Sequence, residues 1–388
     1  MDRSIELNRK LVDQIKSVFR AHFRCRLSPA VEQAFLRVPR HLFIPEVWDI
    51  EDNNWKRFVL NYASPQAEVL ERIYVDRPLV IVVRNGEVIS TSSQPSLMAY
   101  MIELLKVKRG DKVLEVGTGS GYNAGLISEI VGEENMVTVE IERDVAKLAE
   151  SNLRRAGKEK VKVVCGDGAM GWQKDAPYDG VIVTVSVPDV TWWEQLRDGA
   201  RIVLPLITRG VEMLVWAEKV KDKLEGEVVL PVRFLTFSGA YSIFSHYKRN
   251  IKAIARMIRK GKVDDKLSSM LGKLTPRERI SFQFFVALQD ESAFAFIPSE
   301  DEEDIGEGFG LWKKASPFGI AMILPRGVVC WGDEGPRRQL ENYFSEWQNR
   351  KLMFSDYKVE FYQRGANVET EGFAIPRRKS ITVFIPKK

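Results

Sequence analysis

Cysteine and histidine are both scarce in this sequence. The 388 residues contain three cysteines, Cys25, Cys165 and Cys330, and three histidines. The cysteines are too widely spaced for a disulfide framework or for the short ligand spacing of a zinc site. So few histidines also argue against a Ser-His-Asp catalytic triad and against His-rich metal sites. We therefore expect a protein that uses no metal.

Long apolar runs are missing as well. No stretch approaches the roughly 18–20 apolar residues that cross a membrane. The first ten residues, MDRSIELNRK, are charged and lack the apolar core of a signal peptide. We therefore expect a cytoplasmic protein without a membrane partner. Hydrophobic residues at 45% and charged residues at 29% are typical of a globular protein, and the length predicts two domains.

Charge is distributed unevenly along the chain. Residues 1–240 carry a formal net charge of −1, and residues 241–388 carry +6. The segment 241–280 alone holds 11 basic and 3 acidic residues, a net of +8. A local basic block of this kind indicates a surface for a polyanion, although a solvated helix face would produce the same pattern.

The most informative motif lies in residues 113–123, VLEVGTGSGYN. Residues 113–116 form a short apolar run typical of a buried parallel strand. Gly117, Gly119 and Gly121 follow at G-x-G-x-G spacing, and a helical pattern comes next. No Lys-Ser/Thr pair follows the glycines, which excludes a Walker-type phosphate loop, and the spacing differs from the dinucleotide-binding G-x-G-x-x-G. Strand, glycine turn and helix indicate the first unit of a nucleotide-binding α/β fold.

Two acidic residues narrow the choice of ligand. Glu115 lies inside the predicted strand, and Glu140 ends the next strand. A carboxylate at a strand end can accept two charge-assisted hydrogen bonds from a ribose diol. Acidic residues in both places suit a cationic cofactor with an adenosine ribose, such as S-adenosylmethionine.

Alternating strand and helix patterns continue after this motif. They predict a doubly wound sheet, in which ligands bind beyond the carboxyl ends of the strands. The loops at those ends are 117–121, 140, 166–168 and 185–189. The predicted strands are 113–116, 136–140, 161–165, 178–184 and 200–206, with a helix over 144–156 and further strands near 212–218 and 226–236.

The segments on either side have patterns of their own. Apolar spacing predicts helices over 5–24, 29–37 and 96–105, and Asn85-Gly86 predicts the turn of a hairpin over 79–90. Residues 47–73 are polar and mixed, which predicts a loop or insertion. The C-terminal patterns predict a helical basic segment over 241–275, an acidic loop over 299–309, strands over 319–324, 327–331, 357–362 and 380–385, and a helix near 336–350.

Residues 1–240 resemble the protein-L-isoaspartate O-methyltransferase family, whose members depend on S-adenosylmethionine. The matching stretches occur in the family's order. The resemblance implies a Rossmann-like, doubly wound methyltransferase domain, with N-terminal helices and a hairpin in 1–105 and the core in 106–240. Residues 241–388 are predicted to form a smaller basic α/β domain for substrate recognition. The stretches are VEQAFLRVPRHLFIPE, YVDRPL, TSSQPSLMAYMIELL, GDKVLEVGTGSGYNAGLISEIVG, GDG, YDGVIVTVSVP, LRDGARIVLPL and LPVRFLTFSG.

The resemblance also assigns site residues. The methionine end of the cofactor would be held by Glu115 and by Gly117, Gly119 and Gly121, with Thr118 beside them. Glu140 would bond the ribose next to Ile141, and Asp167 and Gly168 would lie beside the adenine. The family's substrate-facing segment would contain Thr91, Ser93 and Gln94.

The acceptor side departs from the family pattern. VVRNGEVIS replaces a short glycine-rich link, residues 47–73 look inserted, and Ser186-Val187-Pro188-Asp189 replaces an Ala-rich stretch. The stretch Ser186-Val187-Pro188-Asp189 partly matches the Asp/Asn/Ser-Pro-Pro-aromatic motif of methyltransferases that act on nucleobase amines. In those enzymes an aromatic side chain stacks on the base. Trp192 and Trp193 follow closely, although buried packing would explain them equally.

These departures lead to a prediction about the substrate. We predict methylation of structured RNA, rRNA or tRNA, at an exocyclic base amine such as cytidine N4, with RNA or the ribosome as partner. The alternative is carboxyl methylation of isoaspartyl proteins, and a third reading is a non-catalytic cofactor-binding module. The predicted catalytic residues are Thr91, Ser93, Ser186 and Pro188, and the predicted substrate-binding residues are Ser92, Gln94, Asp189, Trp192 and Trp193.

Overall fold

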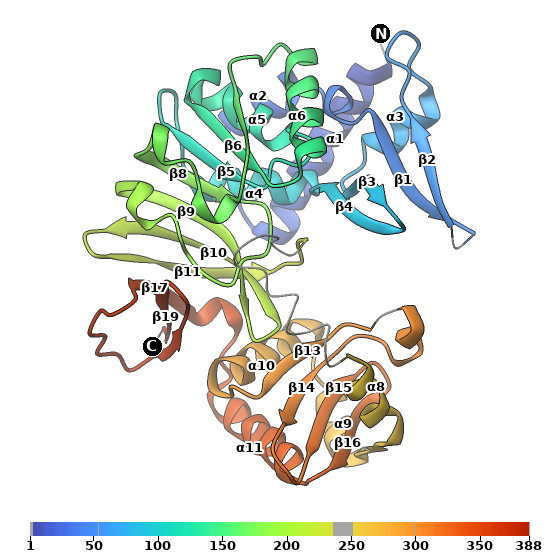
Figure 1. Ribbon diagram of the computed structural model, residues 1–388, viewed down its shortest axis with the longest axis vertical. Helices are drawn as coiled ribbons and strands as arrows, with labels where there is room; N and C mark the ends of the chain where they lie inside the picture. The colour runs from blue at the N-terminus through green and yellow to red at the C-terminus, as the bar shows by residue number, and fades with distance from the viewer. Residues whose placement is uncertain (1–2, 53, 236–250, 299, 388) are drawn as a thin grey trace. The chain divides into compact units, whose positions relative to one another are not determined.

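The structure is a computed structural model that describes residues 3–52, 54–235, 251–298 and 300–387 (Figure 1). The described chain divides into two compact units, the first made of residues 3–185 and 191–204 and the second of the remainder. Strand β9 (Leu196–Thr208) runs through both units. Across the described ranges, no helix combines the length and the apolar character needed to span a bilayer.

The first unit contains a parallel sheet, as the alternating patterns predict. Its strand order is β9-β8-β5-β6-β7, and every neighbouring pair is parallel. All the strands therefore end at one edge, where a doubly wound fold binds its ligand. The strands besides β9 are β5 (Val113–Val116), β6 (Met136–Glu140), β7 (Lys162–Cys165) and β8 (Tyr178–Val183).

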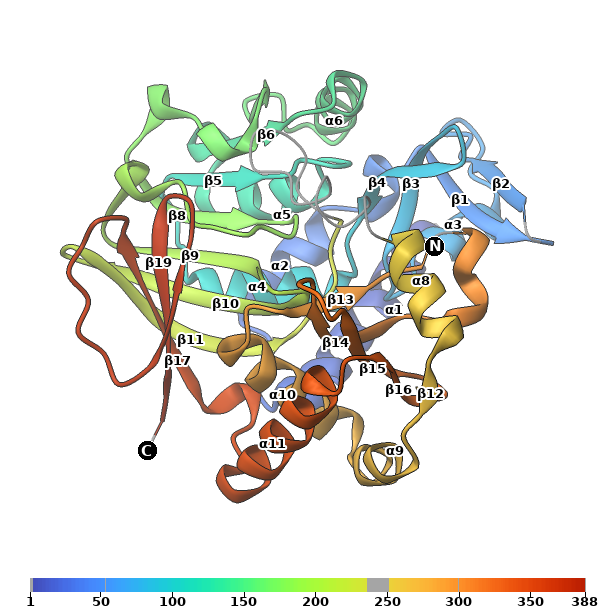
Figure 2. The ribbon, with the colours of Figure 1, turned by 60° about the horizontal axis from the view of Figure 1, so that its bottom comes forward.

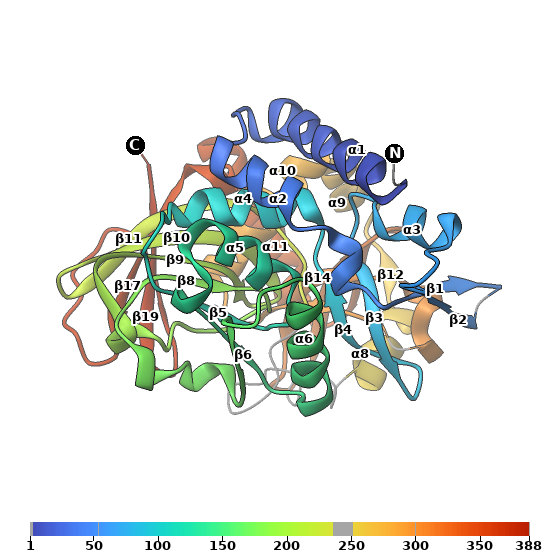
Figure 3. The ribbon, with the colours of Figure 1, turned by 90° about the horizontal axis from the view of Figure 1, so that it is seen from above.

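Helices pack against this sheet and against one another (Figure 3). Helix α2 begins as its sequence predicts, because Ser28 Oγ accepts a hydrogen bond from Val31 N–H at 3.3 Å and proline occupies the first helical position. The long N-terminal helical pattern forms an α-helix that ends in one turn of π-helix, Phe19–Phe23. The helices are α1 (Arg3–Val18), α2 (Pro29–Arg37), α4 (Pro95–Leu105), α5 (Tyr122–Val131) and α6 (Arg143–Arg155).

A second, four-stranded sheet with order β2-β1-β3-β4 also belongs to the first unit. The predicted hairpin is confirmed: Asn85 and Gly86, with φ of 53° and 81°, turn the chain between its strands. The prediction of a loop for residues 47–73 is wrong, because that segment contains most of two strands and a helix. The elements are β1 (Glu46–Glu51), β2 (Asn54–Val59), α3 (Ala67–Ile73), β3 (Leu79–Arg84) and β4 (Glu87–Ser92).

The second unit contains two sheets. In the first of them the order is β18-β19-β17-β11-β10-β9, and the pairs from β10 to β18 are antiparallel. Residues 205–235 thus form one compact unit with the C-terminal residues, because β11 pairs with β17. The strands are β10 (Val211–Val220), β11 (Lys223–Pro231), β17 (Tyr357–Gln363), β18 (Phe373–Pro376) and β19 (Ser380–Pro386).

The other sheet has five strands in the order β12-β16-β15-β14-β13 (Figure 2). Its core joins Ile254 and Ile258 of α8 to Ile320 and Met322 of β15. The predicted acidic loop forms a turn of 3-10 helix, Glu300–Ile305, before β14. The elements are α8 (Ile251–Lys260), β12 (Lys262–Val263), α9 (Asp265–Gly272), α10 (Pro276–Gln289), β13 (Ala293–Phe296), β14 (Gly308–Lys313), β15 (Gly319–Leu324), β16 (Gly327–Gly332) and α11 (Gly335–Arg350).

Candidate active site

The glycine loop connects β5 to α5 at the carboxyl edge of the parallel sheet. Gly117 has a φ of +96°, and a Cβ atom built on it would lie 2.7 Å from Thr184 Oγ1. Gly119 has a φ of +53°, and its Cβ would lie 3.0 Å from the Thr91 carbonyl oxygen. Both positions require glycine, since a side chain would be strained and would meet atoms of neighbouring segments. The loop therefore passes closely between the end of β8 and the end of β4.

Glu140 ends β6 and bonds to the glycine loop. Its Oε2 accepts a hydrogen bond from Gly119 N–H at 3.1 Å, and its Oε1 accepts one from Glu142 N–H at 3.1 Å. Burial raises the pKa of this carboxyl, although these N–H donors oppose the rise. Each oxygen keeps a second lone pair. The carboxylate can therefore hold the loop and still accept hydrogen bonds from a ribose diol.

Glu115 lies in the interior of the protein, inside β5. Its carboxylate accepts hydrogen bonds from Asn123 Nδ2 at 2.7 Å and Thr138 Oγ1 at 2.6 Å. Thr138 Oγ1 also lies 2.7 Å from Thr118 Oγ1. Burial raises the pKa of Glu115 to about 7. Through these contacts Glu115 and Thr118 stabilise the shape of the loop, and their direct contact with the cofactor stays a prediction.

The ends of β6 and β7 lie side by side, since Gly166 N–H donates to the Glu140 carbonyl oxygen at 2.8 Å. Asp167 Oδ1 accepts a hydrogen bond from Ala169 N–H at 2.9 Å and caps a turn of 3-10 helix that begins at Gly168. Two apolar side chains are exposed here, Ile141 at 37% and Met170 at 68%. The carboxylates can accept hydrogen bonds from the polar groups of an adenosine moiety. The apolar side chains can pack against its ring.

Met170 is the residue of this group that the sequence reasoning missed. Its signal is modest: an apolar residue directly after Gly-Asp-Gly-Ala at a strand end. An exposed apolar side chain at such a loop needs an explanation only because the loop lies at the ligand-binding edge of the sheet.

The acceptor segment, residues 91–96, runs from the last residues of β4 into the first turn of α4. Thr91 lies against the glycine loop, as the contact with Gly119 shows. Ser92 is buried, whereas Ser93 and Gln94 are half-buried. The structure therefore brings the predicted acceptor segment beside the predicted cofactor loop. Which of its side chains contact the substrate stays a prediction.

The residues after β8 are more enclosed than the acceptor segment. Ser186 is 1% exposed, and its Oγ donates to the Phe234 carbonyl oxygen at 3.2 Å. Asp189 is 3% exposed, and its carboxylate accepts hydrogen bonds from Ser380 Oγ and Lys379 N–H, both at 2.6 Å. Pro188 is half-buried. Within the second unit, these contacts connect the segment after β8 to residues that follow β11 and to the start of β19.

The two tryptophans are packed into the first unit. Trp192 is 1% exposed, and its indole N–H donates to the Gly168 carbonyl oxygen at 2.7 Å. Trp193 is 8% exposed. Trp192 therefore supports the turn that follows Asp167. Neither indole presents an open face on which a base could stack.

Comparison with known proteins identifies the relatives of this chain. The family model for Protein-L-isoaspartate(D-aspartate) O-methyltransferase (PCMT) matches residues 8–242. A protein-L-isoaspartate O-methyltransferase of Thermotoga maritima is 38% identical over 329 residues, covering 83% of this chain and 88% of that protein. One of Methanopyrus kandleri is 38% identical over 217 residues, covering 55% and 82%. A solved protein-L-isoaspartate O-methyltransferase has a TM-score of 0.54 and 28% identity, covering 91% of this chain and 96% of its own.

These relatives contradict the prediction of an RNA substrate. The Thermotoga maritima protein matches 83% of this chain, which is more than residues 1–240 can supply. Part of the C-terminal region therefore recurs in a protein named for isoaspartate methylation. The extra region is no evidence for RNA, and the prediction of RNA or ribosome as partner is wrong.

Two basic residues of the block pair with acidic residues that lie far away in the sequence. Arg259 Nη2 pairs with Asp304 Oδ1 at 2.7 Å, within the acidic turn after β13. Lys266 pairs with Glu341 of α11. Charge counted along the segment therefore leaves out the acidic partners of these two residues. Residues 241–250 of the block lie outside the described residues.

Proposed function

The chain belongs to the protein-L-isoaspartate(D-aspartate) O-methyltransferase family, and from this premise we propose that it methylates L-isoaspartyl residues in damaged proteins. As a member, it is an S-adenosylmethionine-dependent methyltransferase, so the predictions of fold class, enzyme class and cofactor are confirmed. In an isoaspartyl residue the peptide chain continues through the side-chain carboxyl. The α-carboxylate is therefore free and can act as the nucleophile.

One geometric observation carries the proposal. Gly119 of the cofactor loop lies so close to Thr91 that a Cβ atom would meet the Thr91 carbonyl oxygen at 3.0 Å. An acceptor held by residues 91–94 would therefore lie next to a donor held by the loop. Hydroxyl and amide groups, as in Thr91, Ser93 and Gln94, are suitable hydrogen-bond donors for a carboxylate.

Orientation is the main contribution that these residues would make. The bound cofactor supplies a methyl group on a positively charged sulfur. Glu140 would accept hydrogen bonds from the ribose, and Asp167 would fix the adenine end. Thr91 and Ser93 would direct one carboxylate lone pair in line with the methyl group, which lowers the entropic part of the barrier.

No general base is required for this reaction. An α-carboxyl has an ordinary pKa of about 3.3–3.7, so the acceptor is already ionised at neutral pH. This explains how a chain with three histidines can carry out the chemistry. We propose that Ser186, Pro188 and Asp189 shape the segment after β8 and that Trp192 and Trp193 support the adenine end, because most of these side chains are buried. A cytoplasmic location remains a prediction.

The test is a methyl-transfer assay with labelled S-adenosylmethionine and two peptides that differ only in one linkage, isoaspartyl or aspartyl. We expect label in the isoaspartyl peptide alone, in a form that mild alkali releases, since carboxyl methyl esters hydrolyse in base. Cofactor binding is measured in parallel. A protein that binds the cofactor but labels neither peptide would contradict the proposed substrate.

A further inference from the structure

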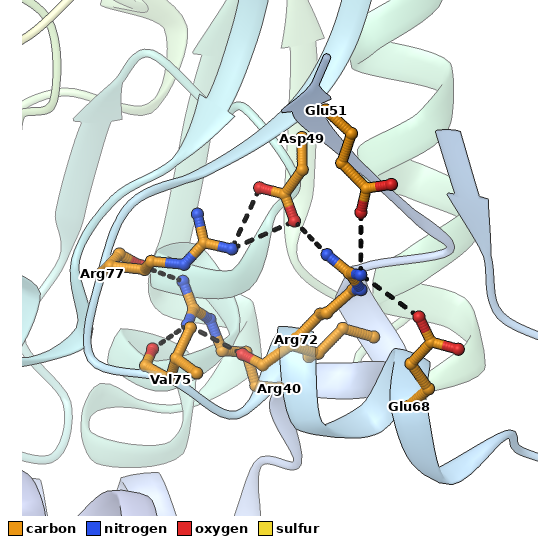
Figure 4. Close-up of polar contacts among 8 residues, drawn as sticks. Arg40, Asp49, Glu51, Glu68, Arg72, Val75 and Arg77 are labelled. Carbon is orange, nitrogen blue, oxygen red and sulfur yellow. Dashed lines mark hydrogen bonds and ion pairs between the residues drawn. The ribbon is translucent and has the colours of Figure 1, made fainter. Parts of the chain in front are cut away.

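Arg40 is a buried arginine that bonds only to backbone oxygens in the described part of the chain. Its side chain is 0% exposed. Nη1 donates to the carbonyl oxygens of Ile73 at 2.9 Å and Val75 at 2.7 Å. Nη2 donates to the carbonyl oxygen of Arg77 at 3.2 Å (Figure 4). It also donates to that of Ser93 at 3.2 Å. One guanidinium therefore joins the turn at residues 73–77 to the acceptor segment.

Four carbonyl oxygens are an unusual environment for a buried cation. A buried charge is costly unless it is paired or fully hydrogen-bonded. Burial lowers the pKa of Arg40 to about 10, so the side chain remains a cation at neutral pH. The planar guanidinium has donors in a rigid fork, and this geometry allows it to reach several acceptors at fixed positions. A lysine has a single nitrogen and could not reach all four.

The turn makes a second connection to the acceptor segment through Asp76. Its Oδ1 accepts a hydrogen bond from Ser96 N–H at 2.8 Å. Its Oδ2 accepts one from Gln94 Nε2 at 3.3 Å. Arg40 and Asp76 therefore hold the acceptor segment at three successive points, Ser93, Gln94 and Ser96.

Arg40 also lies next to the cofactor side of the unit. Its Cζ is 6.0 Å from the ring centroid of Tyr122, within the range of a cation–π contact. Tyr122 is the first residue of α5, directly after Gly121. The guanidinium thus lies near the first residue after the glycine loop and bonds to the acceptor segment.

We propose that Arg40 is a positioning residue for methyl transfer, which fixes Ser93 and Gln94 at the distance from the glycine loop that in-line attack requires. The inference rests on the proposed function, because it assigns the acceptor to residues 91–94. Arg40 acts through these residues, since its own side chain is fully buried. A displacement of about 1 Å in such a site can lower the rate about 10²-fold.

The substitution Arg40→Lys tests this role because it keeps the charge and removes the fork. We expect kcat/KM for an isoaspartyl peptide to fall about 10- to 100-fold. The Kd for S-adenosylmethionine should change by less than about threefold, because no group of the cofactor loop is removed. Activity that falls only in proportion to cofactor binding or to the folded fraction would show a merely structural role and overturn the proposal.

Arg72→Lys is the matched control. Arg72 belongs to the neighbouring network in Figure 4, where it bonds to Asp49, Glu51 and Glu68. None of these residues lies in the acceptor segment. The control should keep kcat/KM within about threefold of the wild type. An equal loss in both variants would overturn a specific role for Arg40.

Hydrogen exchange gives a readout that does not depend on the substrate. In Arg40→Lys, amides of residues 93–98 should exchange at least about tenfold faster, while those of 113–131 keep their protection. If the wild type methylates no isoaspartyl peptide, the proposed function fails. Hydrogen exchange then decides alone whether Arg40 anchors the acceptor segment. Unchanged protection of residues 93–98 in Arg40→Lys would overturn that anchoring. If Arg40→Lys does not fold, Asp76→Ala removes both hydrogen bonds of the second connection and should lower kcat/KM in the same way. Wild-type kcat/KM in that variant would overturn the proposal.

Discussion

Glu140 Oε2 accepts a hydrogen bond from the backbone N–H of Gly119 at 3.1 Å. This contact connects the end of β6 to the middle of the glycine loop. One carboxylate thereby serves two purposes, because it orders the loop and keeps lone pairs available for a ribose. A substitution of Glu140 can therefore weaken cofactor binding in two ways, by disordering the loop or by removing a contact with the ribose.

Glu140→Gln should weaken cofactor binding with little effect on the fold. The amide retains an oxygen for Gly119 N–H, but it gives up the acceptor for Glu142 N–H. It also loses the negative charge that strengthens hydrogen bonds to a diol. A loss of about 1.5–3 kcal/mol corresponds to a rise in Kd of roughly 10- to 100-fold. Calorimetric titration with S-adenosylmethionine measures it. Glu142→Gln is the control, because Glu142 is partly exposed and its side chain pairs with Arg84. Unchanged cofactor affinity in Glu140→Gln would exclude a hydrogen bond from the ribose to Glu140.

Gly117→Ala should disrupt the loop itself. With a φ of +96° and Thr184 Oγ1 at 2.7 Å, an added methyl group is both strained and crowded. We expect cofactor affinity to fall at least about tenfold, measured by the same titration. Gly166→Ala is the matched control at the end of β7, since its Cβ would meet nothing within 4 Å. Similar losses in both variants would show that the loop geometry is not the cause.

Local turn and capping signals made much of the fold predictable. Asn85-Gly86 specifies the hairpin turn, Ser28 caps α2, and Gly117 marks the loop after β5. These signals depend on a residue's own backbone preferences or on partners a few positions away. The parallel core was predictable from apolar runs that alternate with helical patterns, as in β5, α5, β6 and α6.

The strands β1 and β2 carry no comparable signal. Val47 is the only buried residue of β1, and β2 has none. Such a hairpin lacks the alternation of buried and exposed residues that identifies a strand. Its strands exist because β1 and β2 pair along their length, Glu46 with Val59 through Glu51 with Asn54, and β1 also pairs with β3. Long-range pairing of this kind is invisible to patterns read along one segment.

The candidate site also contains residues that local sequence patterns reveal and residues whose partners are distant in the sequence. The glycine loop and Glu140 are apparent from spacing, and the cofactor prediction is confirmed. Arg40 bonds to Ser93 across 53 positions, and Asp189 bonds to Ser380 across 191. Nothing near Arg40 or Asp189 in the sequence indicates those partners. Two basic residues of the block likewise have distant acidic partners, Asp304 and Glu341.

Glu115→Gln should change how stability depends on pH. Burial raises the pKa of Glu115 from its ordinary 4.5 to about 7, so the folded protein binds this proton more tightly than the unfolded chain. The resulting stabilisation is fully present below pH 4.5 and is lost as pH rises through about 7. A shift of this size corresponds to about 3 kcal/mol.

Thermal unfolding of the wild type and of Glu115→Gln at pH 5 and pH 8 measures this effect. The variant has no proton to lose, so its Tm should fall less between the two pH values. The amide can fit, because Thr138 Oγ1 can accept from it and Asn123 can rotate its own amide. Parallel Tm curves for the two proteins would contradict a buried carboxyl that titrates near neutral pH.

Asp189→Ala should destabilise the second unit. The carboxylate of Asp189 is 3% exposed and accepts hydrogen bonds from Ser380 Oγ and Lys379 N–H. Alanine would leave these donors without an acceptor and would release the segment after β8 from β19. Leaving a buried donor without an acceptor costs about 1–3 kcal/mol, so we expect the Tm to fall by several degrees.

The exposed Asp198→Ala is the control and should leave the Tm within about 1 °C. The kinetics of the folded Asp189→Ala protein show whether Asp189 stabilises the second unit or contacts the substrate. Because its carboxylate is already bonded within the second unit, we expect KM for an isoaspartyl peptide to stay within about threefold of the wild type, well below the effect of a lost charged contact. A tenfold rise in KM at unchanged Tm would instead place Asp189 in contact with the acceptor.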